Sequence, residues 1–231
     1  MLLLFDIDGT LLIEAADAHR DAIYDALRVV HGVTRPDPRG MEAAGRTDAD
    51  IARALLVNAG VSADRIDARA DDLRIAACEA YARLRPADLS ARVAPGMAEL
   101  LAQLAAREDT ILSLVTGNYE PIARMKLDAA GIGGFFASGQ GGFGSDDESR
   151  AELPAIARRR AGGGAEPWPR ERTVLIGDTP RDIACARADG VRVVAIATGP
   201  FAAGELTAAD AVARDAHALG AILRDMRTSS S

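Results

Sequence analysis

The sequence predicts an α/β fold, in which a parallel sheet carries helices on both faces and an all-helical segment is inserted after the first strand. After residue 91, short apolar runs alternate with helical segments, a pattern typical of parallel sheets. Between residues 15 and 91 the apolar residues recur at helical spacing throughout. We therefore expect an α/β core domain of residues 1–14 and 92–231 and a helical domain of residues 15–91.

The chain opens with a short apolar run that predicts a buried strand, and two carboxylates, Asp6 and Asp8, follow it. Their i, i+2 spacing places both side chains on one side of an extended backbone. Gly9 then allows the chain to turn sharply. Two acids at the end of a buried strand are costly unless a cation or a substrate uses them. This pattern favours a metal site or an acid–base pair over packing.

The inserted segment is predicted to contain three amphipathic helices, bounded by glycine and proline residues that interrupt the helical spacing. They cover about residues 15–31, 48–59 and 62–84. Ser62 is the predicted N-cap of the last of these helices, because its hydroxyl can accept a hydrogen bond from the first turn.

The core after the insertion is predicted to contain four more strands, each a short apolar run. They cover residues 110–115, 135–137, 173–176 and 191–197. The accompanying helices are expected at residues 95–107, 121–131, 149–160 and 180–188. The Ser229–Ser231 tail is expected to be disordered.

The overall composition is ordinary for a globular protein, with 48% hydrophobic and 26% charged residues. A net charge of −7 and an aromatic content of 4% argue against nucleic-acid binding. No apolar run approaches the ~18 residues that a membrane span needs, and Asp6 interrupts the N-terminus too early for a signal peptide. Cys78 and Cys185 form no CxxC pair, which is typical of a reducing cytosol. We expect a cytoplasmic monomer or homodimer.

Three predicted strand ends carry polar residues of the kind that bind ligands. They are Asp6 with Asp8, the segment Thr116-Gly117-Asn118, and Asp178 with Asp182. Parallel sheets bind ligands at the C-terminal ends of their strands, so we expect these residues to meet at one edge. With Arg150 at a helix start, they would supply an anionic metal site, a hydroxyl with a backbone N–H, and one fixed cation.

These segments resemble the motifs of the haloacid dehalogenase superfamily, in the same order along the chain. Residues 6–10 (DIDGT) resemble its first motif, Thr116 its second, and residues 177–182 (GDTPRD) its fourth. The third motif is a Lys or Arg at the start of the helix before the fourth core strand. Arg150 occupies that place, without the usual Lys-Pro pair, and Lys126 is the alternative. The resemblance to the capped branch, which includes phosphoglycolate phosphatases and β-phosphoglucomutases, implies a Rossmann-like core with a small helical cap.

The resemblance implies that Asp6 is the nucleophile, which forms an aspartyl-phosphate with the substrate. Asp8 would protonate the leaving oxygen and then accept a proton from the attacking water. Mg²⁺ would be bound by Asp6, by the backbone carbonyl of Asp8 and by Asp178, with water molecules completing the octahedron. Asp182 would orient Asp178 or a metal-bound water.

The resemblance also implies contacts to the substrate. Thr116 and the Gly117 N–H would hold the phosphoryl oxygens, with Asn118 beside them, and Arg150 would neutralise charge on the phosphoryl group and the carboxylates. In related capped enzymes a loop such as the one around Arg46 reaches over the active site. Arg46 could therefore bind a second anionic group of the substrate. The alternative for this loop is a helix cap with a solvated arginine.

An acid at position 8 favours phosphate-ester chemistry, because the family members that cleave carbon–halogen bonds have no acid there and the ATP-driven pumps carry threonine. The resemblance thus implies a Mg²⁺-dependent phosphatase that hydrolyses a small phosphorylated metabolite. The alternatives are a phosphomutase that acts on a sugar phosphate and a non-catalytic module that binds phosphate esters. The motifs do not identify the natural substrate.

Other patterns carry less functional information. Residues 139–144 match GxGxxG, but they lead into an acidic segment, so a flexible glycine loop is favoured over dinucleotide binding. His19, His31 and His217 lack metal-ligand spacing and are expected to be solvated or half-buried. Residues 158–160, three arginines, are expected to form a charge cluster at the end of a helix.

Overall fold

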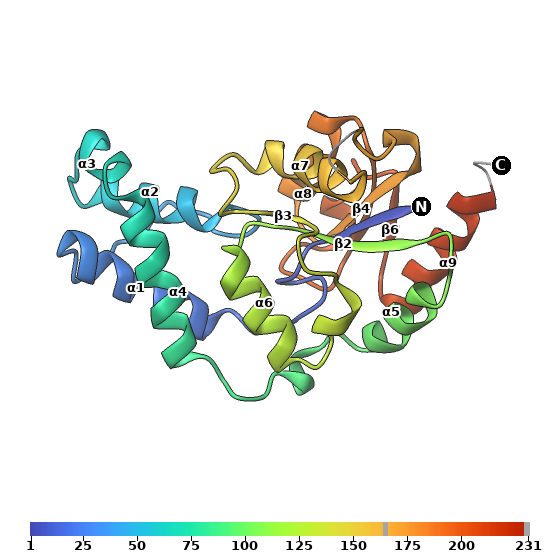
Figure 1. The fold of residues 1–231 in the computed structure, drawn as a ribbon, viewed down its shortest axis with the longest axis horizontal. Coiled ribbons are helices and arrows are strands. Elements are labelled where there is room, and N and C mark those ends of the chain that lie inside the picture. The colour runs from blue at the N-terminus through green and yellow to red at the C-terminus, as the bar shows by residue number, and fades with distance from the viewer. Residues whose placement is uncertain (164–165, 229–231) are drawn as a thin grey trace.

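The computed structural model describes residues 1–163 and 166–228, so the predicted disordered tail lies outside the described residues. Within these residues, six strands form one parallel sheet in the order β3-β2-β1-β4-β5-β6 (Figure 1). The strands are β1 (Leu2–Phe5), β2 (Ile111–Thr116), β3 (Gly142–Phe143), β4 (Thr173–Gly177), β5 (Arg192–Ile196) and β6 (Ala211–Ala213). Every neighbouring pair is parallel, which confirms the predicted sheet type.

Helices cover both faces of this sheet, as the sequence predicts. They are α5 (Met97–Ala105), α6 (Glu120–Ala129), α7 (Leu153–Ala161), α8 (Pro180–Asp189) and α9 (Ala216–Thr228). The side chains of β1 alternate between the faces: Leu3 and Phe5 pack in one apolar cluster with α5, α6 and α9, and Leu2 and Leu4 pack in another with α7 and α8. Because both faces are buried, the central strands are apolar at almost every position.

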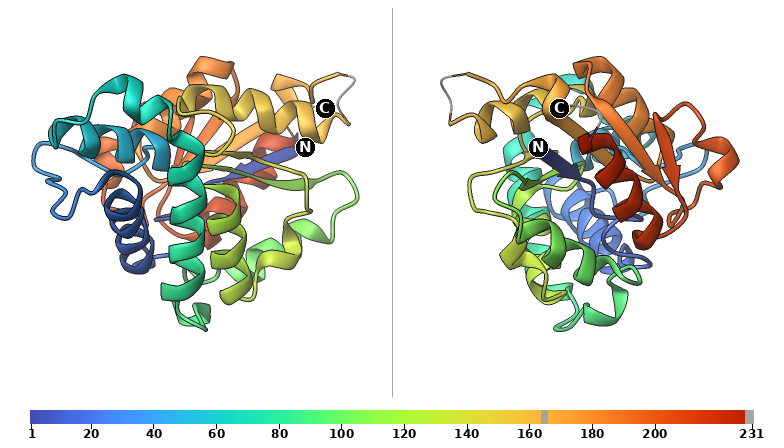
Figure 2. Two further views of the ribbon diagram at one scale, coloured as in Figure 1. Left: turned by 60° about the vertical axis from the view of Figure 1, so that its left-hand side comes forward. Right: turned by 90° about the vertical axis from the view of Figure 1, so that its right-hand side faces the viewer.

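Four more helices follow β1 and lie together beyond the C-terminal ends of the strands (Figures 1 and 2). They are α1 (Asp17–His31), α2 (Asp48–Asn58), α3 (Ala63–Asp67) and α4 (Ala70–Leu84). Their apolar faces form a third cluster around Leu27, Leu55 and Tyr81, which also includes Tyr119, the N-cap residue of α6, and Ile122 on α6. None of the described helices is both long and apolar enough to cross a membrane.

The predicted strand at residues 135–137 is wrong, and the glycine loop predicted at residues 139–144 contains a short strand. Residues Gly133–Phe135 form a 3₁₀ turn, and the edge strand β3 lies within the glycine-rich segment instead. The Phe136 side chain is buried and its ring packs edge-on against Phe5, so this apolar run serves the core without joining the sheet. A Cβ on Gly142 would lie 2.2 Å from the Leu153 carbonyl oxygen, so the close packing of β3 against α7 requires glycine.

Two predicted helices are interrupted. The helix expected at residues 62–84 is divided between α3 and α4, because Arg69 leaves the helical conformation and its guanidinium donates to the carbonyl of Val30 at the end of α1. Ser62 occupies the N-cap position of α3, without a side-chain hydrogen bond. The helix expected at 149–160 begins with a 3₁₀ turn at Arg150–Glu152. The other predicted elements are confirmed to within about two residues at each end.

Candidate active site

Three of the predicted acids meet at the edge formed by the C-terminal ends of β1 and β4. Asp6 directly follows β1 and Asp178 directly follows β4, while Asp182 lies in the first turn of α8. All three side chains are buried, and one carboxylate oxygen from each lies within 4.8 Å of the others. Neighbouring parallel strands bring these carboxylates together from positions more than 170 residues apart in the sequence.

Tight local packing fixes the position of Asp178. Thr10 Oγ1 donates a hydrogen bond of 2.9 Å to Asp178 Oδ1. A Cβ on Gly9 would lie 2.1 Å from Asp178 Oδ2, and one on Gly199 only 1.7 Å from it, so both neighbouring turns require glycine. Asp178 Oδ2 itself is buried and has no hydrogen-bond partner. A buried carboxylate oxygen without a partner is costly, and a cation ligated there would satisfy it.

Arg150 is the cation nearest to these carboxylates. Its guanidinium lies 3.2 Å from Asp6 Oδ1 and makes a close ion pair with Asp182 Oδ1. The other oxygen of Asp182 accepts hydrogen bonds from the N–H and the hydroxyl of Thr179, in a capping box that begins α8. Asp182 therefore holds both Arg150 and the start of α8 in place.

One arginine does not balance the three buried carboxylates. Burial raises the pKa of Asp6 to about 6; the Arg150 charge opposes this rise, and Asp182 and Asp8 add to it. Burial and the charges of Asp6 and Asp182 raise the pKa of Asp178 to about 8. Such shifts mark excess negative charge, which a divalent cation would neutralise. The donor set, which consists of buried carboxylate oxygens, fits a hard cation such as Mg²⁺.

Asp8 faces a different partner from Asp6. The ammonium of Lys126, which is fully buried on α6, lies 2.8 and 2.7 Å from the two carboxylate oxygens of Asp8. Asn118 Nδ2 donates a further hydrogen bond of 3.0 Å to Asp8 Oδ2. Desolvation raises the pKa of Asp8, but the charge of Lys126 and the hydrogen bonds from Lys126 and Asn118 bring it below its ordinary value. In the structure, Arg150 is thus paired with Asp6. Lys126, the alternative candidate for the third motif, is paired with Asp8.

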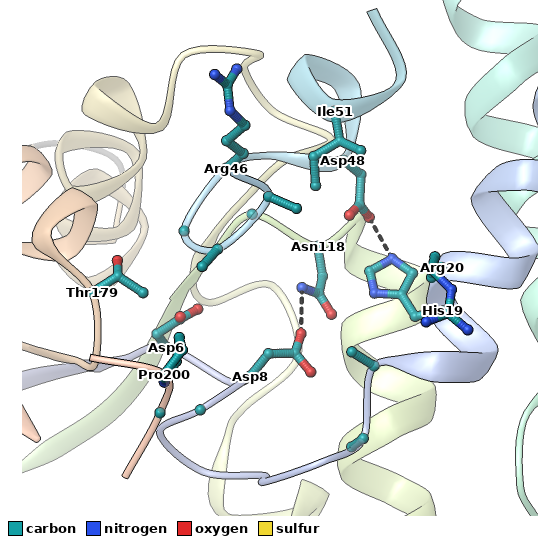
Figure 3. A pocket seen from close by; sticks show the side chains of 18 of the residues that line it. Asp6, Asp8, His19, Arg20, Arg46, Asp48, Ile51, Asn118, Thr179 and Pro200 are labelled. Carbon is teal, nitrogen blue, oxygen red and sulfur yellow. Dashed lines mark hydrogen bonds and ion pairs between the residues drawn. The ribbon is translucent and has the colours of Figure 1, made fainter. Parts of the chain in front are cut away.

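A chain of buried polar groups continues from Lys126 into the inserted helices. His19 Nδ1 lies 3.0 Å from Lys126 Nζ. On the other side of the ring, His19 Nε2 lies 3.0 Å from Asp48 Oδ2 (Figure 3). An ammonium can only donate, so Nδ1 accepts and Nε2 carries the proton donated to Asp48. Asp48 also accepts a 2.7 Å hydrogen bond from the Tyr119 N–H. The chain therefore links Asp8 to α1 and α2.

The expectation that the histidines are solvated or half-buried is wrong for two of the three. His19 is buried because both ring nitrogens have partners. His31 is buried at the end of α1, where burial lowers its pKa, and His217 is exposed. The three arginines predicted to form a charge cluster do lie in the last turn of α7. One of them, Arg158, is buried in an ion pair with Asp189, which the sequence did not predict. A lone histidine or arginine on a helix gives no sequence signal for such long-range partners.

The segment after β2 passes directly beneath the loop that precedes α2. A Cβ on Gly117 would lie 2.0 Å from the Arg46 carbonyl oxygen, and the Asp48 N–H donates a 2.8 Å hydrogen bond to the Gly117 carbonyl. Gly117 and Asn118 line the cavity above the acids, and Thr116 is fully buried at the end of β2. The predicted phosphate-binding segment is thus brought to the same edge as the acids.

Arg46 lines the same cavity but has partners of its own. Its Nη1 lies 2.8 Å from Asp50 Oδ2, and its Nε donates to the Glu42 carbonyl. Figure 3 shows the Arg46 side chain extending away from Asp6 and Asp8. Thr47 is the N-cap of α2 and accepts from the Asp50 N–H, so this loop does cap a helix, with the arginine ion-paired rather than solvated.

Asp6, Asp8, Asp178, Arg150, Gly117 and Asn118 border one cavity of about 750 Å³, whereas the fully buried Asp182, Lys126 and Thr116 do not line it. Its floor consists of Asp6, Asp8, Asp178, Arg150 and the segment after β2, and its opposite wall consists of residues from α1, α2 and the segment between them. This volume lies in the range of enzyme pockets for small organic molecules. The arrangement can bind a cation and a phosphate group on its floor and enclose an organic group above them.

Known proteins resemble this chain in sequence and in fold. A family model described as haloacid dehalogenase-like hydrolase matches residues 3–187. No curated protein matches the sequence. The fold is similar to that of a hydrolase from Pseudomonas syringae, with a TM-score of 0.67 and 22% identity over 97% of this chain and 98% of the other.

It is similar as well to CbbY from Rhodobacter sphaeroides in complex with phosphate, with a TM-score of 0.67 and 21% identity over 95% of this chain and 96% of that one. A variant of CbbY in complex with xylulose-1,5-bisphosphate gives a TM-score of 0.66 and 21% identity, over 93% and 94%. The family model covers most of the sequence, including all three groups of acidic and hydroxyl residues at the strand ends. The chain therefore belongs to the haloacid dehalogenase-like hydrolase family.

Proposed function

We propose that this protein is a Mg²⁺-dependent phosphatase, which hydrolyses a small phosphorylated metabolite through an aspartyl-phosphate on Asp6. The observation that carries the proposal is the buried cluster of Asp6, Asp178 and Asp182, with Arg150 as its fixed cation; Asp6, Asp178 and Arg150 line the floor of a 750 Å³ cavity. Membership of a hydrolase family supports the reaction class.

Mg²⁺ would be held by Asp6, Asp178 and the backbone carbonyl of Asp8. Asp182 would not bind the substrate but would position Arg150, its ion-pair partner, beside these ligands. The unpaired Oδ2 of Asp178 supports this assignment. When bound, the cation supplies positive charge that offsets the charge of the phosphate and the carboxylates. The remaining chemistry belongs to the side chains of the protein.

Asp6 attacks the phosphorus atom, so that a bond forms between its carboxylate oxygen and phosphorus while the ester P–O bond breaks. The electron pair of that bond goes to the leaving oxygen, which takes a proton from Asp8. A bound phosphate ester brings negative charge close to Asp8, which favours the protonated form before this step. Water then attacks the aspartyl-phosphate, Asp8 takes its proton, and Asp6 is regenerated with the release of phosphate. Lys126 favours the ionised form of Asp8 that the second step needs.

The phosphoryl oxygens are bound by the Gly117 N–H, the Thr116 hydroxyl and Asn118, while Arg150 offsets their charge. Residues 15–91 act as a cap that covers the cavity, and Arg46 belongs to the substrate-facing loop of this cap. The proposal also includes a cytoplasmic location, a monomer or homodimer as the active form, and no role for nucleic acid or membranes.

Phosphate release from p-nitrophenyl phosphate tests the proposal, measured with Mg²⁺ and with EDTA. We expect turnover that requires Mg²⁺ and that falls to the background rate in Asp6→Asn, whose circular dichroism remains that of the wild type. Turnover of Asp6→Asn at the wild-type rate would rule out the covalent mechanism. Analysis of the products of a sugar monophosphate separates the two reactions: a phosphatase releases inorganic phosphate, whereas a phosphomutase yields an isomeric sugar phosphate.

A further inference from the structure

The wall of the cavity that faces the acids is apolar. It is formed by side chains of the inserted segment, mainly from α1, α2 and the residues that connect them. These are Ile23, Tyr24, Pro38, Met41, Ile51 and Leu55. A ligand whose phosphate lies on Asp6 and Arg150 therefore places the rest of its structure against hydrocarbon.

The two arginines on this side of the cavity are already paired. Arg20 lies 3.0 Å from Asp17 and 3.2 Å from Asp21, which are neighbours on α1. Arg46 lies 2.8 Å from Asp50 on α2. Each guanidinium is thus offset by a carboxylate of the same segment, so a second phosphate of a substrate would meet little net positive charge there.

Two further polar side chains contributed by α1 and α2 are engaged as well. His19 and Asp48 are hydrogen-bonded to each other, and both have further partners in the core, Lys126 and the Tyr119 N–H. The hydroxyl groups of a sugar would lose their hydrogen bonds to water on this wall without a full replacement, and each such loss weakens binding. An alkyl or aryl group gains from the same contact.

On the basis of the proposed phosphatase function, we propose that the substrates are monophosphate esters of a largely apolar alcohol, rather than sugar phosphates or bisphosphates. The polar floor binds the single phosphate, and the apolar wall binds the organic group. The cavity volume of about 750 Å³ suits an organic group considerably larger than a three-carbon unit.

The wild-type enzyme tests this inference directly with a series of straight-chain alkyl monophosphates, from ethyl to hexyl. Their leaving groups are primary alcohols of nearly equal acidity, so differences in kcat/KM report how the chain is bound. We expect kcat/KM to rise about threefold to fourfold with each added methylene until the wall is covered. Hexyl phosphate should exceed both glucose 6-phosphate and hexane-1,6-diyl bisphosphate by at least about tenfold.

Ile51→Asn places a polar group on the apolar wall, and Ile75→Asn is its matched control, because Ile75 is an exposed isoleucine on α4 that does not line the cavity. We expect Ile51→Asn to lower the ratio of kcat/KM for hexyl over ethyl phosphate, and Ile75→Asn to leave that ratio unchanged. Thermal unfolding of both variants shows whether the fold is retained.

Acetyl phosphate, a small activated substrate with almost no organic group, separates this inference from the proposed function. Suppose that the enzyme turns over acetyl phosphate, but kcat/KM for the alkyl phosphates does not depend on chain length, or kcat/KM is higher for the sugar phosphate or the bisphosphate. Either result would overturn the assignment of the substrate class alone. Failure to hydrolyse acetyl phosphate or any member of the series would overturn the phosphatase proposal and this inference with it.

Discussion

Asp6 and Asp8 lie two residues apart, yet they have different cationic partners and their pKa values shift in opposite directions. Asp6 shares Arg150 with Asp182, and burial raises its pKa to about 6. Asp8 has a dedicated ammonium from Lys126, and its pKa is lowered. Two carboxylates with different partners can perform different tasks, one as a nucleophile and metal ligand and the other as a proton carrier.

Lys126→Met keeps the length of the side chain but removes the charge that orients Asp8. We expect kcat for an alkyl phosphate to fall about 10²-fold, since a misplaced catalytic group can cost that much. The fall for p-nitrophenyl phosphate should be smaller, because its leaving group needs no proton. Steady-state kinetics with both substrates measures the difference.

Arg28→Met is the matched control, because Arg28 is an exposed cation on α1 that is ion-paired to Asp25 and does not line the cavity. It should leave both kcat values unchanged. If Lys126→Met lowered kcat equally for the two substrates while its thermal stability stayed normal, Lys126 would have no specific role in proton transfer by Asp8.

At the scale of elements, strand ends and tight turns position the site. The apolar runs of β1, β2 and β4 and the polar residues after them could be predicted from the sequence, because parallel strands place their C-terminal ends at one edge. The edge strand β3 could not be predicted, because its two residues, Gly142 and Phe143, carry no strand pattern. Strand β6 is only one residue longer, and only its pairing with β5 defines it. Helix α9 is not among the predicted helices, although its buried Leu219 and Leu223 have helical spacing.

Gly117→Ala tests the contact between the end of β2 and the loop before α2. The added methyl group would lie 2.0 Å from the Arg46 carbonyl oxygen, so the loop must move. We expect a destabilisation of about 1–3 kcal/mol and a clear loss of kcat/KM, measured by denaturant unfolding and by phosphate release. Gly134→Ala is the matched control, because a Cβ at that position has no neighbour within 4 Å. Equal behaviour of the two variants would contradict the proposed role of this contact.

At the scale of the whole molecule, the inserted helices and the sheet are joined through polar groups as well as through apolar packing. The chain from Asp8 through Lys126 and His19 to Asp48 connects residues from four separate segments. The meeting of the acids could be predicted because they belong to strand ends, whose positions follow from the topology of the sheet. The roles of His19 and Asp48 could not, since a helix position alone does not reveal which distant side chain it faces.

The stability of the whole molecule should depend on pH and on Mg²⁺ together. The pKa values of Asp6 and Asp178 are raised, to about 6 and about 8, so between about pH 4 and 8 the folded metal-free protein holds more protons at these groups than the unfolded chain. Its stability should therefore fall as the pH rises through that range. Mg²⁺ should restore stability, and more strongly at pH 8 than at pH 5, because metal binding requires ionised carboxylates.

Thermal unfolding at several pH values, with and without Mg²⁺, measures this dependence. Asp178→Asn should flatten the pH dependence of the metal-free protein and abolish most of the stabilisation by Mg²⁺. An equal effect of Mg²⁺ on the wild type and on Asp178→Asn would show that the cation binds elsewhere.

The central claim is that carboxylates from separate segments share one cation and that the first of them becomes phosphorylated during turnover. The most direct measurement is to quench the enzyme during turnover, reduce it with borohydride, and map the product by mass spectrometry, since an acyl phosphate is reduced to an alcohol. The account predicts homoserine at position 6, formed only when both Mg²⁺ and substrate are present. Turnover with an unmodified residue 6, or modification at another acid, would contradict it.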